Sequence, residues 1–86
     1  MNIQEKVSQF ILNNFLMHES NIDLDINASL LEEGIIDSTG VLELVSFLES
    51  EFSVKITEDE IIPENLDTIE NIVAFVEKKK NLLNRI

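Results

Sequence analysis

The chain has 86 residues, which suits a single domain over residues 1–86 and is too short for a two-lobed active site. Its 17 acidic and 6 basic residues give a net charge of −11, so we expect protein partners with basic surfaces, no nucleic acid and no membrane. The absence of cysteine excludes disulfides and cysteine-bound zinc. We also find no signal peptide and no apolar run of membrane-spanning length, so we expect a cytoplasmic protein.

The first predicted element is an amphipathic helix. From Ile3 to about Leu16, apolar residues recur at the spacing of one helix face. No sustained period follows between residues 18 and 36, where turn-forming residues are frequent. We interpret this stretch as a long loop whose leucines pack onto the core, namely Leu24, Leu30 and Leu31.

A second helix is expected from Asp37 and Ser38 to about Phe52, with Asp37 as its N-cap. Gly40 falls in its first turn, where glycine costs about 1 kcal/mol relative to alanine. Its inward stripe consists of Val41, Leu44, Val45, Leu48 and Phe52.

The rest of the chain predicts a short helix and a long one. Val54 and Ile56 should anchor a connection, and residues 57–62 should form a turn or two of helix before the proline at 63. A last helix should begin near Asp67, which with Glu70 has the spacing of a capping box. The expected fold is therefore all-α, with three long helices, one short helix and a long loop between the first and second. Its expected interior consists of Val7, Phe10, Val45, Leu48, Phe52, Ile72 and Val76.

Side chains suited to catalysis or to metal binding are scarce. The single histidine, His18, lies 20 residues before Ser38, so we expect no enzyme. The string Asp23-x-Asp25-x-Asn27 imitates the start of a calcium-binding loop, but the glycine and glutamate that such a loop needs further along are missing. We expect no metal site and interpret the string as a polar loop held by Asx-turns.

The string Gly34-x-x-Asp37-Ser38 directly precedes the second helix. A serine at a helix start has its hydroxyl in water beside unpaired backbone N–H groups, where the helix dipole favours an anion. Ordinary helix capping explains Asp-Ser equally well. Together with Leu30-Leu31 before it and the run from Val41 to Phe52 after it, the string resembles the phosphopantetheine attachment region of acyl carrier proteins.

This resemblance covers most of the chain and implies a small four-helix acyl-carrier-like bundle of the discrete, stand-alone type. It implies that Ser38 receives 4′-phosphopantetheine from coenzyme A through a separate phosphopantetheinyl transferase, and that Asp37 is the acid of the motif. The terminal thiol of the group would carry an acyl or aminoacyl unit as a thioester, loaded by a ligase and presented to downstream acyl-processing enzymes. We expect a monomer, and the sequence leaves open whether the interior encloses a cavity for an acyl chain.

Three features depart from the commonest pattern of the family. Thr39 stands where leucine usually follows the modified serine, Gly40 stands where an acid is frequent, and residues 60–65 form a longer stretch. These departures favour a carrier of a specialised pathway, loaded by a separate adenylating ligase with an amino acid or an unusual acyl unit.

The charge pattern predicts where partners bind. No lysine or arginine occurs from Val7 to Val54, whereas nine acids do, and such a face steers docking to basic surfaces. The partner-binding candidates are Leu42, which lies off the inward stripe, and the acids Glu43 and Glu49. The acidic face also fits a role in solubility alone, and Leu42 also fits a position under the loop. The alternative function is an unmodified acidic helical adaptor that docks basic proteins.

Overall fold

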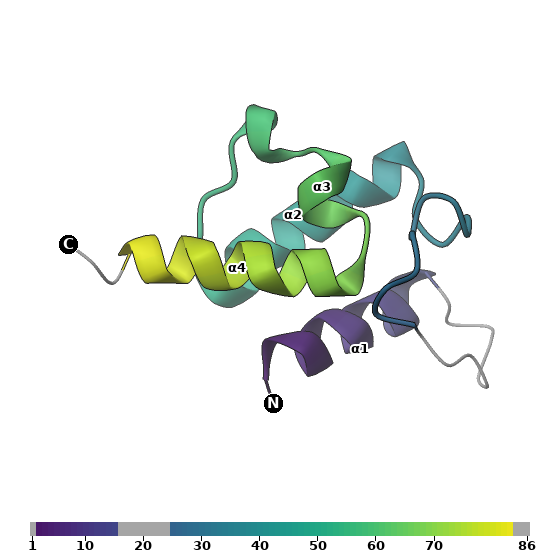
Figure 1. Ribbon diagram of the computed structural model, residues 1–86, viewed down its shortest axis with the longest axis horizontal. Helices are drawn as coiled ribbons and strands as arrows, with labels where there is room; N and C mark the ends of the chain where they lie inside the picture. Colours follow the sequence, from purple (N-terminus) through teal and green to yellow (C-terminus); the bar gives the residue numbers. More distant parts are fainter. Residues whose placement is uncertain (1, 16–24, 84–86) are drawn as a thin grey trace.

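The computed structural model describes residues 2–15 and 25–83, and the regular structure in these ranges is entirely helical. Three long helices, α1 (Ile3–Phe15), α2 (Ser38–Phe52) and α4 (Ile69–Leu83), are accompanied by a short helix, α3 (Pro63–Leu66), and a 3₁₀ turn, η1 (Glu58–Glu60). Helix α4 contacts each of the other three helices, and Figure 1 shows it lying across α2 with α1 alongside. The predicted all-α, four-helix fold is confirmed.

The core lies where the inner faces of the three long helices meet. Of the interior residues named from the sequence, Phe10 is half-buried and the others are buried. Within residues 2–15 and 25–83, no helix combines the length and hydropathy needed to cross a membrane. The buried apolar cluster consists of Val7, Ile11, Leu30, Ile36, Leu44, Val45, Leu48, Phe52, Val54, Ile56, Leu66, Ile69, Ile72, Phe75 and Val76.

The loop before α2 closes one side of this core. Leu30 is 1% exposed, but Leu31 is 41% exposed, so the expectation that both leucines pack inward is wrong for Leu31. The backbone explains the difference, because Leu30 N donates to the carbonyl oxygen of Asp67 at 2.7 Å and Leu31 N donates to the Asp67 carboxylate at 3.0 Å. These two bonds fix a turn in which Leu30 alone faces the core.

The polar string in this loop behaves as expected where it is described. Asp25 Oδ1 accepts from Asn27 N at 2.9 Å, which forms an Asx-turn. His18, Asp23 and Leu24 lie outside the described residues.

Residues 53–62, which we call the strap, connect α2 to α3. Val54 and Ile56 are buried and anchor it, as predicted. The turn η1 falls within the stretch where a short helix was expected, but the short α-helix itself begins at Pro63. Proline is favourable there because its missing N–H would have no partner in the first turn of a helix.

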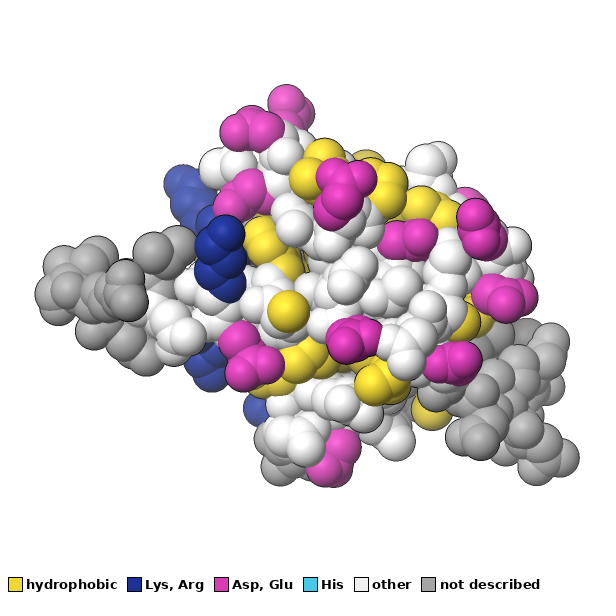
Figure 2. Space-filling view, in the orientation of Figure 1, with side chains coloured by type: hydrophobic (Ala, Val, Ile, Leu, Met, Phe, Trp, Pro, Cys, Tyr) yellow, Lys and Arg dark blue, Asp and Glu magenta, His cyan; other side chains and the backbone are white. Residues whose placement is uncertain are grey.

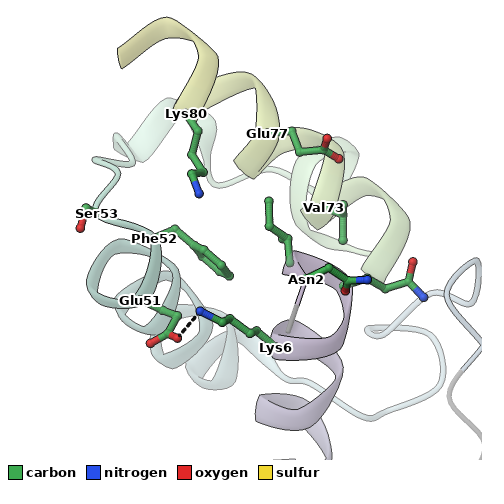
Figure 3. Close-up of a pocket in the computed structure, with 10 residues that line it drawn as sticks. Asn2, Lys6, Glu51, Phe52, Ser53, Val73, Glu77 and Lys80 are labelled. Carbon is green, nitrogen blue, oxygen red and sulfur yellow. Dashed lines mark ion pairs between the residues drawn. The ribbon is translucent and has the colours of Figure 1, made fainter. Parts of the chain in front are cut away.

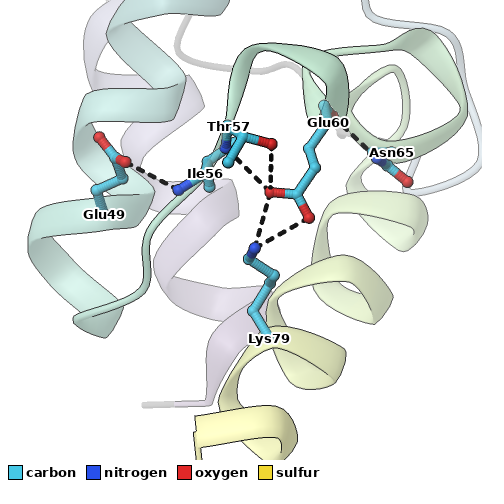
Figure 4. A network of polar contacts seen from close by, with 6 residues as sticks. All are labelled: Glu49, Ile56, Thr57, Glu60, Asn65 and Lys79. Carbon is cyan, nitrogen blue, oxygen red and sulfur yellow. Dashed lines mark hydrogen bonds and ion pairs between the residues drawn. The ribbon is translucent and has the colours of Figure 1, made fainter.

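Two carboxylates fasten the strap to the long helices (Figure 4). Glu49 of α2 accepts from Ile56 N at 2.9 Å. Glu60 accepts from Lys79 Nζ of α4 at 2.7 and 2.9 Å and from Thr57 N at 3.0 Å. The hydrogen bond from Lys79, followed by that from the Thr57 backbone, lowers the pKa of Glu60 below its ordinary value. Glu60 is therefore held as a structural carboxylate.

The start of α4 differs from its prediction. Its cap is Thr68, whose hydroxyl accepts from Asn71 N at 3.0 Å. The capping box between Asp67 and Glu70 does not form, because the Asp67 carboxylate is engaged with the loop, where it accepts from the hydroxyl of Ser29 at 2.6 Å. Asp67 joins the loop to the bundle instead of capping a helix.

Candidate functional site

The candidate site is the first turn of α2. Ser38 is the first residue of this helix and is exposed, as are its neighbours Asp37 and Thr39. Asp37 has an extended backbone and its Oδ1 accepts from Gly40 N at 2.7 Å, so it is the predicted N-cap. This bond fixes the start of the helix and leaves the Ser38 side chain in water.

Backbone N–H groups of this turn are available beside the Ser38 hydroxyl. Val41 N donates to the Asp37 carbonyl at 3.0 Å, and Gly40 N to the Asp37 carboxylate. Among the described residues, the N–H groups of Ser38 and Thr39 have no acceptor. Two such groups at the positive end of a 15-residue helix stabilise an anion. The arrangement therefore fits a phosphodiester on the Ser38 oxygen.

Gly40 is buried directly beneath this turn. A Cβ at this position would lie 2.8 Å from Phe15 Cε1 and 3.2 Å from Ile36 Cγ2. The glycine is thus required by the close approach of α1 and the loop, a reason that sequence reasoning did not find because Phe15 lies far away along the chain. The space beneath the first turn of α2 is therefore filled by the side chains of Phe15 and Ile36.

An apolar crevice of about 90 Å³ opens between the first half of α2 and α3. Val41 lies three residues after Ser38, so the crevice begins on the face of the helix that carries the serine. The residues that line it are Leu31, Val41, Ile61, Ile62, Pro63, Leu66 and Asp67.

Two exposed apolar side chains line this crevice, and a third, Leu42, follows Val41 on α2. Leu42 is 59% exposed, which confirms that it lies off the inward stripe and is not covered by the described part of the loop. Leu31 and Ile62, exposed by 41% and 37%, line the crevice itself. Sequence reasoning missed these two residues, because only the turn at Leu31 and the strap at Ile62 turn them outward.

The charges separate along the molecule. Lysines lie at Lys6, at Lys55 and in the run from Lys78 to Lys80, so they gather near the end of α4 and the adjoining strap. On the face shown in Figure 2, the opposite end carries acidic side chains and no lysine or arginine. A basic partner is therefore attracted to the end that presents Ser38.

The two acids predicted to bind partners differ in the structure. Glu43 is exposed on α2, about 1.4 turns from Ser38. Glu49 is half-buried and is hydrogen-bonded to Ile56 N, so part of its role is to hold the strap. The structure places Asp37, Ser38 and Leu42 at the start of α2, Glu43 in its second turn beside the groove along α1, and Glu49 further along the helix.

Comparison with known proteins gives concordant results. Residues 15–76 match the family model described as the phosphopantetheine attachment site. The chain is 36% identical over 78 residues to a probable acyl carrier protein, PigG, from Serratia sp., which covers 91% of this chain and 88% of that protein. It is 33% identical to the acyl carrier protein of Petrotoga mobilis, over 91% of this chain and 87% of that one. It is 37% identical over 57 residues to the D-alanyl carrier protein of Abiotrophia defectiva, over 66% of this chain and 70% of that one.

Proposed function

The chain belongs to the acyl carrier protein family and has 4′-phosphopantetheine as its prosthetic group, and from this premise we propose that Ser38 is the attachment residue. The exposed hydroxyl of Ser38 at the first residue of α2, beside two N–H groups without an acceptor, carries this proposal. Other serines fit less well, since Ser38 alone among the described serines begins a helix. Asp37 supports the site by capping that helix.

We further propose a single-domain, monomeric and cytoplasmic carrier that presents an acyl or aminoacyl unit to other enzymes and catalyses no reaction itself. The chain has no cysteine and therefore no thiol of its own. The prosthetic group, once attached, supplies the thiol that forms the thioester. The Asp37 cap keeps the attachment oxygen of Ser38 in water. The exposed acids of the loop and of α2 give this end of the molecule a negative charge. One relative is named for D-alanine and others for acyl groups, which supports both kinds of cargo.

The proposed partners are a phosphopantetheinyl transferase, a loading ligase and downstream acyl-processing enzymes. They would dock on the apolar and acidic surface beside Ser38, where Leu42 and Glu43 are exposed. A partner with basic residues around an apolar contact is complementary to this surface. Glu49 adds charge at a greater distance while it holds the strap.

Intact mass spectrometry tests the attachment. We expect the purified chain to gain one phosphopantetheine when it is incubated with coenzyme A, magnesium and a broad-specificity transferase. Ser38→Ala should gain none, whereas Ser46→Ala, which alters an exposed serine further along α2, should be modified like the wild type. An unchanged wild-type mass would contradict the proposal and favour the unmodified acidic adaptor.

A further inference from the structure

The loop before α2 is fastened to the bundle by Asp67, which lies between α3 and α4. We propose that Asp67 is a positioning residue for the modification of Ser38, because it acts through the loop and sets where the Ser38 hydroxyl lies. This inference rests on the proposed attachment at Ser38 and adds a residue 29 positions further along the chain. It is carried by the hydrogen bonds of Asp67, by the contacts that lead from them to α2, and by the location of the other fastenings.

Asp67 is half-buried and uses both carboxylate oxygens on the loop. Its Oδ2 accepts from the Ser29 hydroxyl at 2.6 Å, and its Oδ1 accepts from Leu31 N at 3.0 Å. Its carbonyl oxygen accepts from Leu30 N at 2.7 Å. One residue therefore holds three consecutive residues of the loop, which Figure 1 shows beside the start of α4.

The turn held by Asp67 also holds the end of the loop. The Leu30 carbonyl oxygen accepts from Ile35 N at 2.9 Å and from Ile36 N at 3.2 Å. The last two residues before the cap of α2 are thus hydrogen-bonded to a residue that Asp67 itself binds. A displacement of the turn must displace them as well.

Ile36 and Asp37 carry this constraint into α2. Ile36 is 2% exposed, and its Cγ2 lies 3.2 Å from the point that a Cβ at Gly40 would occupy. Asp37 accepts from Gly40 N at 2.7 Å. Ser38 directly follows Asp37, so the same contacts that start the helix set its backbone. A shift of the loop therefore shifts the Ser38 hydroxyl.

The carboxylate of Asp67 has a specific share in this link. Within residues 2–15 and 25–83, the side-chain hydrogen bonds from the loop to the region of α3 and α4 all end on this carboxylate. A backbone bond from Glu70 N to the Ile26 carbonyl at 2.9 Å joins an earlier part of the loop to α4. This bond and the one to the Asp67 carbonyl survive any substitution of the Asp67 side chain. A variant there keeps the loop near the bundle but loses its hold on Ser29 and Leu31.

The other fastenings of α2 lie toward its far end. Lys6 of α1 pairs with Glu51 at 3.1 Å, beside a groove of about 640 Å³ between α1, α2 and α4 (Figure 3). Glu49 accepts from Ile56 N of the strap at 2.9 Å. Both acids lie about three turns or more after Ser38. They hold the end of α2, whereas the loop acts on its start.

The modification depends on where the Ser38 oxygen lies. This oxygen bonds to the phosphorus next to pantetheine in coenzyme A, and the pyrophosphate bond breaks. Adenosine bisphosphate leaves, and the hydroxyl proton passes to water or to a base of the transferase. A displacement of about 1 Å in such a reaction can cost about 100-fold in rate.

Binding to the transferase depends on different residues. The proposed docking residues Leu42 and Glu43 lie on α2 itself, so they keep their places on the helix when the loop loosens. Loss of the Asp67 carboxylate should therefore lower kcat and leave KM for the carrier nearly unchanged.

Steady-state kinetics of the phosphopantetheinyl transferase test this expectation. For Asp67→Ala we expect kcat to fall about tenfold and KM for the carrier to stay within about twofold of the wild type. Asp67→Asn keeps an acceptor for Leu31 N and should retain at least about half of the wild-type kcat. Partial unfolding alone would instead raise the apparent KM and leave kcat unchanged, since only folded carrier binds. That result, or an equal loss of kcat in the two variants, would overturn the inference.

Glu60→Ala is the matched control. Like Asp67→Ala, it removes a carboxylate that binds one backbone N–H and one side chain, but these belong to the strap and to α4. Its kcat should equal that of the wild type. A fall in kcat as large as that of Asp67→Ala would show that any loosened fastening slows the transferase, and the inference would be wrong.

Ser29→Ala tests the same link from the loop side and replaces Asp67→Ala if that variant does not fold. It removes one of the two bonds to the carboxylate, so kcat should fall by a smaller factor than in Asp67→Ala. The double variant should be no slower than Asp67→Ala, because both substitutions remove the same bond. Losses that multiply, or an unchanged kcat in Ser29→Ala, would contradict the inference.

Hydrogen exchange of the unloaded chain separates this inference from the attachment itself. The Gly40 amide, which donates to Asp37, should exchange several-fold faster in Asp67→Ala and at the wild-type rate in Glu60→Ala. If the wild type gains no phosphopantetheine, the attachment proposal fails, and exchange still reports whether Asp67 holds the start of α2. An unchanged rate at Gly40 in Asp67→Ala would overturn the inference even if Ser38 is modified.

Discussion

The segment from the loop before α2 to the second turn of that helix, and the strap, both carry several acids, but the acids have different roles in the two regions. Around Ser38, Glu43 is exposed and makes no hydrogen bond or ion pair with another described residue. At the strap, Glu49 of α2 accepts from Ile56 N, and Glu60 accepts from Thr57 N and from Lys79. The first region presents chemistry to other molecules, and the second keeps the scaffold in place. The difference teaches that an acidic composition alone does not identify a docking surface.

The largest expected effect is on the free energy of unfolding, and it distinguishes a leucine of the scaffold from a leucine of the proposed docking surface. Leu66→Ala, which removes a side chain that is 4% exposed, should lower the free energy of unfolding by about 3 kcal/mol. Leu42→Ala, at a residue 59% exposed, should change it by less than about 0.5 kcal/mol. Urea denaturation of the unloaded chain measures both values.

The rate of modification by the phosphopantetheinyl transferase should be affected more by Leu42→Ala than by Leu66→Ala. At a temperature where both variants are folded, Leu42→Ala should reduce kcat/KM of the phosphopantetheinyl transferase, whereas folded Leu66→Ala should be modified at nearly the wild-type rate. A strongly destabilised Leu42→Ala variant would show that this leucine belongs to the scaffold and not to the docking surface.

The sequence predicted the elements that depend on neighbouring residues. The bounds of α1 and α2, the Asp37 cap and the exposure of Leu42 follow from helical spacing and from local capping. Contacts between residues distant in sequence were not predictable in this way. Asp67 and Ser29 are 38 residues apart, and Glu60 and Lys79 are 19 apart. Such long-range partners explain why the capping box and the inward packing of Leu31 were wrong.

The second prediction compares two acids on the same helix. Glu43→Lys should leave stability nearly unchanged and should slow turnover by a basic partner several-fold in low salt, with a smaller effect in high salt. Glu49→Lys should show the same salt dependence and also lower the free energy of unfolding by about 1 kcal/mol, since Ile56 N loses its acceptor. Steady-state kinetics at two salt concentrations and urea denaturation provide the measurements. Equal losses of turnover at both salt concentrations would argue against electrostatic steering.

The smallest expected effect is the pH dependence of the strap. Its bonds to Lys79 and Thr57 hold the pKa of Glu60 below its ordinary value in the folded chain. A carboxylate with a lowered pKa stabilises the fold above the pKa of the unfolded state, and this contribution is lost as the pH falls through the folded value. Wild type should therefore exceed Glu60→Gln in unfolding free energy by less than about 1 kcal/mol at pH 7, because the pair is partly exposed.

This advantage over Glu60→Gln should shrink as the pH falls from the ordinary pKa of a glutamate toward the lowered pKa of Glu60 in the fold, where its carboxylate becomes protonated. Glu58→Gln is the matched control, since Glu58 lies in the same turn, is exposed and forms no ion pair with another described residue. It removes one acid from the same turn without removing a bond to Lys79, so it should not reproduce the effect of Glu60→Gln. Urea denaturation of the three proteins between pH 7 and about pH 3 measures the difference. A gap between wild type and Glu60→Gln that stayed constant over this range would mean that packing of the strap, and not the charge of Glu60, holds it against α4.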